Sequence, residues 1–507
     1  MVVNNRFGRF INSSLLSILV SFVIFLFVFF TPPDSFLNMH SVTYSYNSDT
    51  PSYLRFFIDP WRSMRSPGYS LFLSTFLEPH RERMNYIIKN SNGLPYNKLF
   101  STSEGLPEFI DAAGLEGVFD DIVLCQRILL GLGAAFFVYA CSLYINSLVV
   151  GGSFLLAVQV VPLVDATYIL TESVAQPLSF FAMGLLLLFF KKSKFPLLFL
   201  GALCASSLYL VRPPGIYMLV LAGICWFYFF WKGHFHHAFK FFFTAVGFLP
   251  AIAYIGYISI TSGYLMFGTH PKNSDLQFTC YYLQKEDINN MPTLRAREYA
   301  RIYLDKIDAW KKDNAQSAMG LDYEDWPSTK SFGYRYNTAV WPLVHGLDSA
   351  ILAELAKNPQ IGRLSNKARL IMGRELKEGM LERHTADRIK TVCVNMLTGL
   401  GYYRDYMGSS LWKYGFPLII GAWSVWCLAL LLCPRVRFCL FLPGAAHLLH
   451  VFAIAYGNFI LPRYIDLTET LFVFGVFLSL WSLVERLCQF YQKRYGDKCE
   501  KTLAAVM

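Results

Sequence analysis

The sequence predicts an all-α polytopic membrane protein with about ten transmembrane helices. Of its 507 residues 54% are hydrophobic and only 16% are charged, whereas soluble domains carry nearer a quarter of charged residues. Apolar runs of roughly 20 residues recur, each long enough to cross a hydrocarbon core about 30 Å thick. The net charge of +10 fits basic residues in short inner loops and at the C-terminus better than nucleic-acid binding.

The first apolar run, at 15–30, follows Arg6 and Arg9 and could be mistaken for a signal peptide. No small-x-small cleavage pattern follows it, since the next residues are Thr-Pro-Pro-Asp. We therefore expect an uncleaved signal anchor that forms the first span, with the N-terminus in the cytoplasm.

A long polar stretch at 32–121 then lies on the outer side. Within it, Pro67–Leu77 is apolar but too short to span, which predicts a juxtamembrane helix in the outer interface. Basic inner loops and the turns between runs place both termini inside. The remaining spans are predicted at 122–145, 148–164, 172–190, 195–211, 214–231, 240–260, 412–432, 437–456 and 466–484.

Three segments follow from this topology. Residues 1–260 form an N-terminal transmembrane catalytic module that includes the outer loop 32–121. Residues 261–411 form a large, mainly helical, soluble outer region, with helix-prone stretches at 294–312 and 349–390. Residues 412–507 form the C-terminal transmembrane helices and a basic cytoplasmic tail.

The cysteines and histidines do not predict a metal site. Most of the 11 cysteines fall in or beside spans, where they pack as small hydrophobes. Cys280 and Cys393 lie in the outer region, and the sequence leaves open whether they form a disulfide. The histidines at 234, 236 and 237 favour an interfacial loop over a zinc site.

Five ionisable residues from distant parts of the chain are predicted at outer span ends or in outer loops. Ionisable groups at a membrane boundary are costly unless they are paired or used. Because all five are predicted at the outer boundary of the membrane, they suggest one shared cavity, whereas a transporter more often places such groups at mid-membrane. The five are Asp49, Arg65, Glu172, Arg212 and Arg463.

Each of the five also has a structural interpretation. Asp49, before Thr-Pro, could cap a helix, and Glu172 could be a first-turn acid favoured by the helix dipole. Arg65 and Arg463 could extend to the lipid headgroups. Arg212, before Pro-Pro-Gly, could mark a tight turn.

The order of these residues carries a family resemblance. An acid after the first helix is followed by Arg-Ser-Pro-Gly-Tyr at 65–69 before a short apolar helix, and then by Tyr-Ile-Leu-Thr-Glu at 168–172. Leu-Val-Arg-Pro-Pro-Gly at 210–215 and Pro-Arg-Tyr at 462–464 complete the series. The pattern resembles the GT-C superfamily of membrane glycosyltransferases, in particular the aminoarabinose-transferase and protein O-mannosyltransferase branch. The resemblance covers 14–260 and the last hundred or so residues, and leaves 261–411 without a motif.

The resemblance implies roles for the acids and one aromatic residue. Asp49 takes the position of the family's catalytic acid, which acts as the base, and Glu172 that of its second acid. Tyr53 matches the aromatic residue that accompanies the first acid.

It also implies contacts with the lipid phosphate or the donor. Arg65, Arg212 and Arg463 match the family's basic residues at these motifs, and Tyr69 and Tyr464 lie beside them in the same motifs. Two departures from the family pattern are a serine at 66 in place of the first proline and a polar insertion at 78–120. They leave the sugar and the acceptor unassigned.

The function that follows is transfer of a sugar from a polyprenyl-phosphate donor, with inversion, to a glycolipid, polysaccharide or protein acceptor at the outer face. Arginines can stabilise the charge that grows on the phosphate, and a carboxylate can take the proton of the incoming hydroxyl. No cofactor is assured, since two carboxylates are weak evidence for a divalent cation. The expected location is a bacterial inner membrane with the site facing the periplasm, or the endoplasmic reticulum in a eukaryote. A transporter or lipid flippase, or a polysaccharide polymerase or ligase, are the alternatives.

Overall fold

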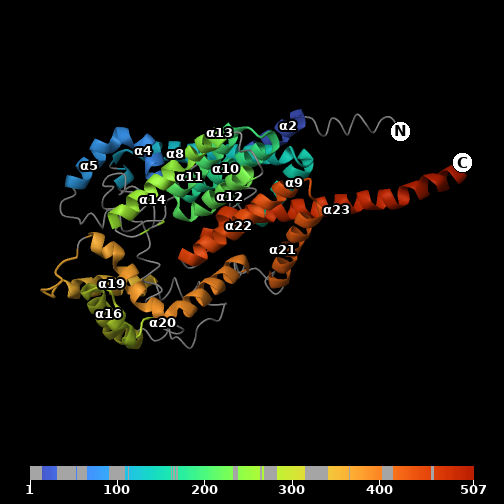
Figure 1. Ribbon diagram of the computed structural model, residues 1–507. Helices are drawn as coiled ribbons and strands as arrows, with labels where there is room; N and C mark the ends of the chain where they lie inside the picture. Colours follow the sequence, from blue (N-terminus) through green and yellow to red (C-terminus); the bar gives the residue numbers. More distant parts are fainter. Residues whose placement is uncertain are drawn as a thin grey trace. The chain divides into compact units, whose positions relative to one another are not determined.

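The computed structural model describes residues 14–30, 53, 66–90, 109–111, 113–161, 163, 166, 170–231, 238–262, 265, 267, 282–313, 341–364, 366–401, 415–457 and 462–506 (Figure 1). In these residues the regular structure is helical, with α-helices and short 3-10 helices and no strand. The chain divides into two compact units. The first unit contains residues 1–251, 416–450 and 465–507, and the second contains 252–415 and 451–464.

The first unit is a bundle of apolar helices built around α10. The sequence of α10 is apolar on all sides between Glu172 at its start and Lys191 and Lys192 in its last turn. A helix of this kind is stable when it is surrounded, and α8 and α11 pack against it. The helices of this unit are α2 (Ser14–Phe30), α4 (Pro67–Leu77), α5 (Arg81–Asn90), α8 (Glu116–Ser142), α9 (Ser147–Val160), α10 (Glu172–Lys192), α11 (Phe195–Val211), α12 (Ile216–Trp231), α13 (Ala238–Ala245), the start of α14 (Leu249–Ser262), α21 (Gly415–Leu432), most of α22 (Arg437–Gly457) and most of α23 (Pro462–Val506).

Six helices of the described chain are long and apolar enough to cross a membrane, and they make this a membrane-embedded protein. They cover 116–142, 172–192, 213–231, 242–261, 437–456 and 467–492. The other four predicted spans fall on the shorter apolar helices α2, α9, α11 and α21. Ten spans, and the direction in which they cross, therefore stay predictions.

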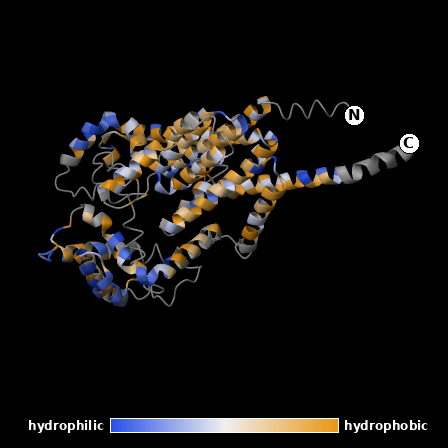
Figure 2. Cartoon of the chain, viewed as in Figure 1, coloured by the Kyte–Doolittle hydropathy of each residue, from blue (hydrophilic) through white to orange (hydrophobic). Residues whose placement is uncertain are grey.

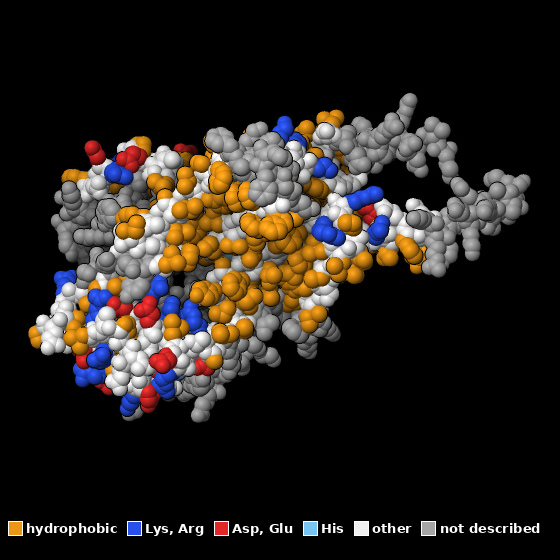
Figure 3. All heavy atoms as spheres, viewed as in Figure 1, with side chains coloured by type: hydrophobic (Ala, Val, Ile, Leu, Met, Phe, Trp, Pro, Cys, Tyr) orange, Lys and Arg blue, Asp and Glu red, His pale blue; other side chains and the backbone are white. Residues whose placement is uncertain are grey.

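The surface of the bundle is apolar, as a lipid-facing surface requires. Figure 2 shows the helices of the first unit, apart from α5, as mainly hydrophobic, while α16 and the first half of α20 alternate between hydrophobic and hydrophilic residues. In Figure 3, hydrophobic side chains gather over the bundle helices, and acidic and basic side chains gather over the helices of the second unit. Exposed large apolar residues on the spans include Leu132, Val220, Phe227, Leu249 and Leu448.

The C-terminal helices belong to the same unit as the N-terminal ones. Phe474 of α23 packs against Phe137 of α8 and Phe154 of α9, with ring centroids 5.3 and 5.9 Å apart. Phe438 of α22 stacks on Phe190 of α10 at 4.2 Å. Residues that the sequence assigns to a separate C-terminal segment therefore complete the core of the first unit.

The short apolar stretch before the polar insertion forms a helix with the predicted bounds, α4. Pro67 occupies its first turn, where its fixed φ suits a helix and no amide is needed. The buried face of α4 consists of Tyr69, Ser70, Leu73 and Leu77. The prediction that α4 lies in a membrane interface is not tested by the structure.

The second unit contains its own small core. Its helices are the remainder of α14, η5 (Lys285–Asn290), α16 (Leu294–Asp313), α19 (Trp341–Leu355) and α20 (Asn366–Gly401). Tyr299, Ile351, Met372, Leu376 and Met380 are among its buried residues. The helix predicted at 294–312 is confirmed by α16.

The helix-prone stretch at 349–390 is interrupted in the structure, contrary to expectation. The backbone carbonyl of Asn358 accepts hydrogen bonds from the amides of Ile361 and Gly362, and Gly362 has a φ of +62°, a conformation that favours glycine. The stretch is therefore split between α19 and α20. Cys393 of α20 carries a free, exposed thiol, and Cys280 lies outside the described residues.

Candidate functional site

The centre of the candidate site is a buried ion pair between Glu172 and Arg212. Glu172 is the first residue of α10, and Arg212 ends α11 just before the Pro-Pro-Gly turn η2. A guanidinium nitrogen (Nη1) lies 2.7 Å from Glu172 Oε1, and the two side chains are only 7% and 14% exposed. Glu172 does lie in the first turn of a helix, and Arg212 does lie at a turn. The two side chains also contact each other.

Tyr53 and Thr171 extend this pair. The Thr171 hydroxyl donates to Glu172 Oε2 at 2.7 Å, and the Tyr53 hydroxyl lies 3.3 Å from Thr171 Oγ1. A threonine has a single hydroxyl proton, so Tyr53 is the donor in its contact with Thr171. The result is a chain of polar contacts from Tyr53 through Thr171 to Glu172 and Arg212.

Tyr69 closes the cluster from α4. Its ring packs edge-on against the ring of Tyr53, with centroids 5.1 Å apart. Its hydroxyl donates to Gln126 Oε1 at 2.9 Å, and Gln126 in turn donates to the carbonyl of Ala166 at 2.8 Å. Burial, and then the neighbouring Tyr53 and Glu172, raise the pKa of Tyr69 well above its ordinary value, so this phenol stays neutral.

The helix α4 is anchored directly beside Arg212. Ser66, in the position of the family's first proline, does not cap α4; its hydroxyl donates instead to the carbonyl of Val211 at 2.9 Å. Gly68 packs against the same segment, and a Cβ added there would lie 2.5 Å from the Val211 nitrogen. The 65–69 motif and the 210–215 motif therefore contact each other, as a shared site requires.

The remaining predicted site residues are only partly covered by the structure. Asp49 and Arg65 lie outside the described residues. Arg463 and Tyr464 form part of the first turn of α23, but the positions of their side chains are not described. The structure thus brings together Tyr53, Tyr69, Glu172 and Arg212, and does not test the other four.

A second polar layer, which we did not predict from the sequence, includes Ser179, about two turns after Glu172 in α10. Nδ1 of His447 and Nδ1 of His450 lie 3.1 and 2.9 Å from the Thr468 hydroxyl. The His450 ring packs on Tyr217 with centroids 4.6 Å apart, and the Tyr217 hydroxyl lies 2.8 Å from Ser179 Oγ. The sequence feature that could have predicted this layer is a pair of histidines three residues apart in an apolar span. Such a pair stands out because ionisable residues inside a membrane are costly.

The cluster has the charges needed to bind an anion and none of the usual features of a metal site. Arginine presents five donors in a planar fork and can bind a phosphate while it keeps a carboxylate partner. Among the described residues no three histidine, cysteine or acidic side chains gather as metal ligands. The described part of the cluster therefore holds one guanidinium, which Glu172 keeps in place.

Comparison with known proteins does not add a family to this geometry. Searches of protein-family models, curated proteins and solved structures give no match to the chain. Evidence for a function therefore comes from the sequence motifs of the site and from the contacts between them.

Proposed function

We propose that this protein is a membrane glycosyltransferase of the GT-C type that transfers a sugar from a polyprenyl-phosphate donor to an acceptor hydroxyl. In this proposal the reaction takes place at the outer face of the membrane and inverts the anomeric carbon. Arg212 binds the phosphate of the donor, Glu172 and Tyr53 position Arg212, and Asp49 is the base. Arg65, Arg463, Tyr69 and Tyr464 complete the donor site.

The observation that supports the proposal best is the chain of contacts from Tyr53 to Arg212. The GT-C resemblance was drawn from motifs scattered along the sequence, and Tyr53 and Thr171 alone are 118 positions apart. A first-turn acid and a turn arginine have no reason to meet if each serves only its own helix end. The contact between Glu172 and Arg212, extended by Thr171 and Tyr53 in one buried cluster, favours a common site.

The bonds, electron pairs and protons of the proposed reaction balance with the groups named for the site. The acceptor oxygen attacks the anomeric carbon, the bond from that carbon to the phosphate oxygen breaks, and its electron pair leaves with the phosphate. The proton of the acceptor hydroxyl passes to the Asp49 carboxylate. The Arg212 guanidinium stabilises the charge that grows on the leaving phosphate. A lipid-linked donor reaches such a site through the bilayer, which explains why the site lies at the ends of membrane helices.

The test is transfer of labelled sugar from a polyprenyl-phosphate donor by membranes that contain the protein. Asp49→Asn should lower transfer about 100-fold or more, because the base is lost. Arg212→Lys keeps the charge but loses the planar fork, so it should also lower transfer strongly. The exposed Arg81 provides the matched control, and Arg81→Ala should transfer at the wild-type rate. Wild-type transfer by Asp49→Asn membranes with equal protein would remove the base assignment.

One observation favours transport, the second candidate function. A transporter more often places ionisable groups at mid-membrane, and His447 and His450 are buried ionisable groups in α22. Such histidines occur in proton-coupled carriers. Under this alternative, sealed vesicles that contain the protein take up the transported solute, and His450→Gln abolishes this uptake. The same membranes show no sugar transfer.

A further inference from the structure

His450 of α22 has one ring nitrogen with a hydrogen-bond partner and one without. Its side chain is completely buried, and Nδ1 lies 2.9 Å from the Thr468 hydroxyl. Nε2 is buried as well, and the described residues supply no hydrogen bond to it. An unpaired polar atom in a native core is rare, and a water or a ligand is the usual explanation. Nε2 of His450 is therefore a candidate contact for a ligand.

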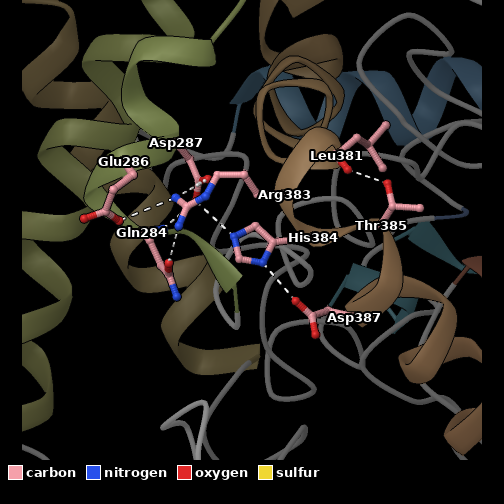
Figure 4. Close-up of polar contacts among 8 residues, drawn as sticks. All are labelled: Gln284, Glu286, Asp287, Leu381, Arg383, His384, Thr385 and Asp387. Carbon is pink, nitrogen blue, oxygen red and sulfur yellow. Dashed lines mark hydrogen bonds and ion pairs between the residues drawn. The ribbon is translucent and has the colours of Figure 1, made fainter.

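A histidine of the second unit shows the more usual arrangement. His384 lies at a kink in α20, and its side chain is 5% exposed. Its Nε2 lies 3.3 Å from Asp287 Oδ2 and its Nδ1 lies 3.0 Å from Asp387 Oδ2, so each ring nitrogen faces a carboxylate (Figure 4). His450 differs in having a nitrogen for which the described part of the chain provides no such group.

A row of polar side chains connects His450 to the ion pair of the candidate site. Glu172, Gln176 and Ser179 are four and three residues apart, which places them on one face of α10. Gln176 and Ser179 are completely buried. Ser179 Oγ lies 2.8 Å from the Tyr217 hydroxyl, and the Tyr217 ring packs on that of His450 with centroids 4.6 Å apart. The polar side chains of the site therefore continue along α10 as far as His450.

The charge of Arg212 acts on the His450 ring. Arg212 precedes the turn η2 (Pro213–Gly215) and Tyr217 follows it. The guanidinium interacts electrostatically with both Tyr217 and His450, and no other charged group acts on His450 as strongly among the described residues. A phosphate held by a guanidinium lies about 2.7–2.9 Å from its nitrogens. A phosphate on Arg212 would therefore have the His450 ring among its neighbours.

We propose that His450 is a further phosphate-binding residue of the donor site, with Nε2 donating to an oxygen of the phosphate that Arg212 binds. This inference rests on the proposed function, which supplies the polyprenyl phosphate. An ionised phosphate oxygen only accepts hydrogen bonds, so the ring carries a proton on Nε2 and Nδ1 accepts from the Thr468 hydroxyl. The oxygen of that hydroxyl can accept in turn from Nδ1 of His447, which lies 3.1 Å away.

The test is binding of polyprenyl phosphate to the purified full-length protein in lipid nanodiscs. The corresponding polyprenol is the probe that lacks the phosphate. His450→Asn keeps a polar group for Thr468, because the short amide lies where the Nδ1 half of the ring lies, but it loses Nε2. We expect its Kd for polyprenyl phosphate to rise about tenfold, since a hydrogen bond to a charged group is lost. Its Kd for polyprenol should not change.

His450→Gln is the matched control. Its longer amide reaches the position of Nε2 and can donate an N–H there, so its Kd for polyprenyl phosphate should stay within about threefold of the wild-type value. Inorganic phosphate at the same concentration should not displace the lipid from the wild type. Displacement would overturn the lipid as the source of the phosphate.

Two results with His450→Asn would overturn the assignment. An unchanged Kd for polyprenyl phosphate would make a buried water the partner of Nε2. An equal loss of affinity for polyprenol would show that the substitution disturbs the site for the prenyl chain. If His450→Asn does not accumulate, a structure of the wild type with bound polyprenyl phosphate decides. A phosphate oxygen at hydrogen-bond distance from Nε2 supports the assignment, and a phosphate elsewhere removes it.

The binding assay separates this inference from the proposed transfer. Phosphate-dependent binding that His450→Asn weakens, in a protein that transfers no sugar, would keep the phosphate site and remove the glycosyltransferase. Sugar transfer by His450→Asn membranes with the wild-type KM for the donor would keep the glycosyltransferase and remove His450 from its site.

Discussion

Two acids that pair with arginines, Glu172 in the first unit and Asp287 in the second, differ in how completely the protein surrounds the acid. Asp287 is completely buried and accepts from a guanidinium, an imidazole and a backbone amide. Glu172 is 14% exposed, and its described partners are the Arg212 guanidinium and the hydroxyl of the adjacent Thr171. Asp287 joins η5 to α20, whereas Glu172 joins the start of α10 to the end of α11.

The difference teaches which buried charge supports the fold and which prepares a site. A carboxylate with three donors in a closed environment is fully engaged, and its partners lose their counterion if it is removed. Under the proposed function, Glu172 instead orients the Arg212 guanidinium toward the phosphate of the donor. We therefore expect substitutions at the Asp287 pair to change stability and substitutions at the Glu172 pair to change transfer.

The largest stability effect should come from Asp287→Ala. It leaves Arg383 and the buried His384 without their carboxylate, and losing hydrogen bonds to a charged group costs roughly 1.5–3 kcal/mol. The measurement is thermal unfolding of the purified protein, with hydrogen exchange of 282–401 to locate the change. The matched control is Glu286→Ala, which removes the exposed partner of the same arginine and should leave the transition unchanged. Equal shifts for the two variants would contradict the comparison.

A smaller effect should come from Gly68→Ala in α4. The added Cβ would lie 2.5 and 2.6 Å from backbone atoms of Val211 and Leu210, so α4 must move away from Arg212. Overpacking of this kind costs about 1–3 kcal/mol, and we expect a lower unfolding temperature together with reduced transfer.

Gly117→Ala in α8 is the control for Gly68→Ala, because nothing lies within 4 Å of a Cβ at Gly117. In a helix this change should be neutral or slightly stabilising. If Gly68→Ala behaved in the same way, α4 would not be held against the 210–215 motif.

The smallest effect should come from Tyr53→Phe, which sharpens the role given to Glu172. It removes the donor to Thr171 but keeps the ring that packs on Tyr69, so stability should change by about 1 kcal/mol at most. Transfer should fall a few-fold, because Arg212 is then held less firmly. The exposed Tyr86 of α5 gives the control Tyr86→Phe, for which wild-type transfer is expected. An unaltered rate in Tyr53→Phe would show that the contact chain does not support the site.

The described part of the candidate site could be predicted from the sequence because its signals are local. An acid at a span start and an arginine before Pro-Pro-Gly stand out against apolar neighbours, and the structure joins Glu172 and Arg212. Ser66 was read only as a departure from a family pattern, although its hydroxyl binds the Val211 carbonyl. That contact joins residues 145 positions apart, and no local pattern encodes such a partner.

The sequence by itself determined that this is a helical membrane protein and where α4 and α16 lie, since hydropathy, proline and helix propensity act within a few turns. Only the tertiary structure decided that the C-terminal helices complete the first unit, that His447 and His450 share Thr468, and that α20 is kinked at His384. These features depend on which side chains meet across distant segments. A buried polar group must find a partner, but the sequence does not say which partner the fold brings to it.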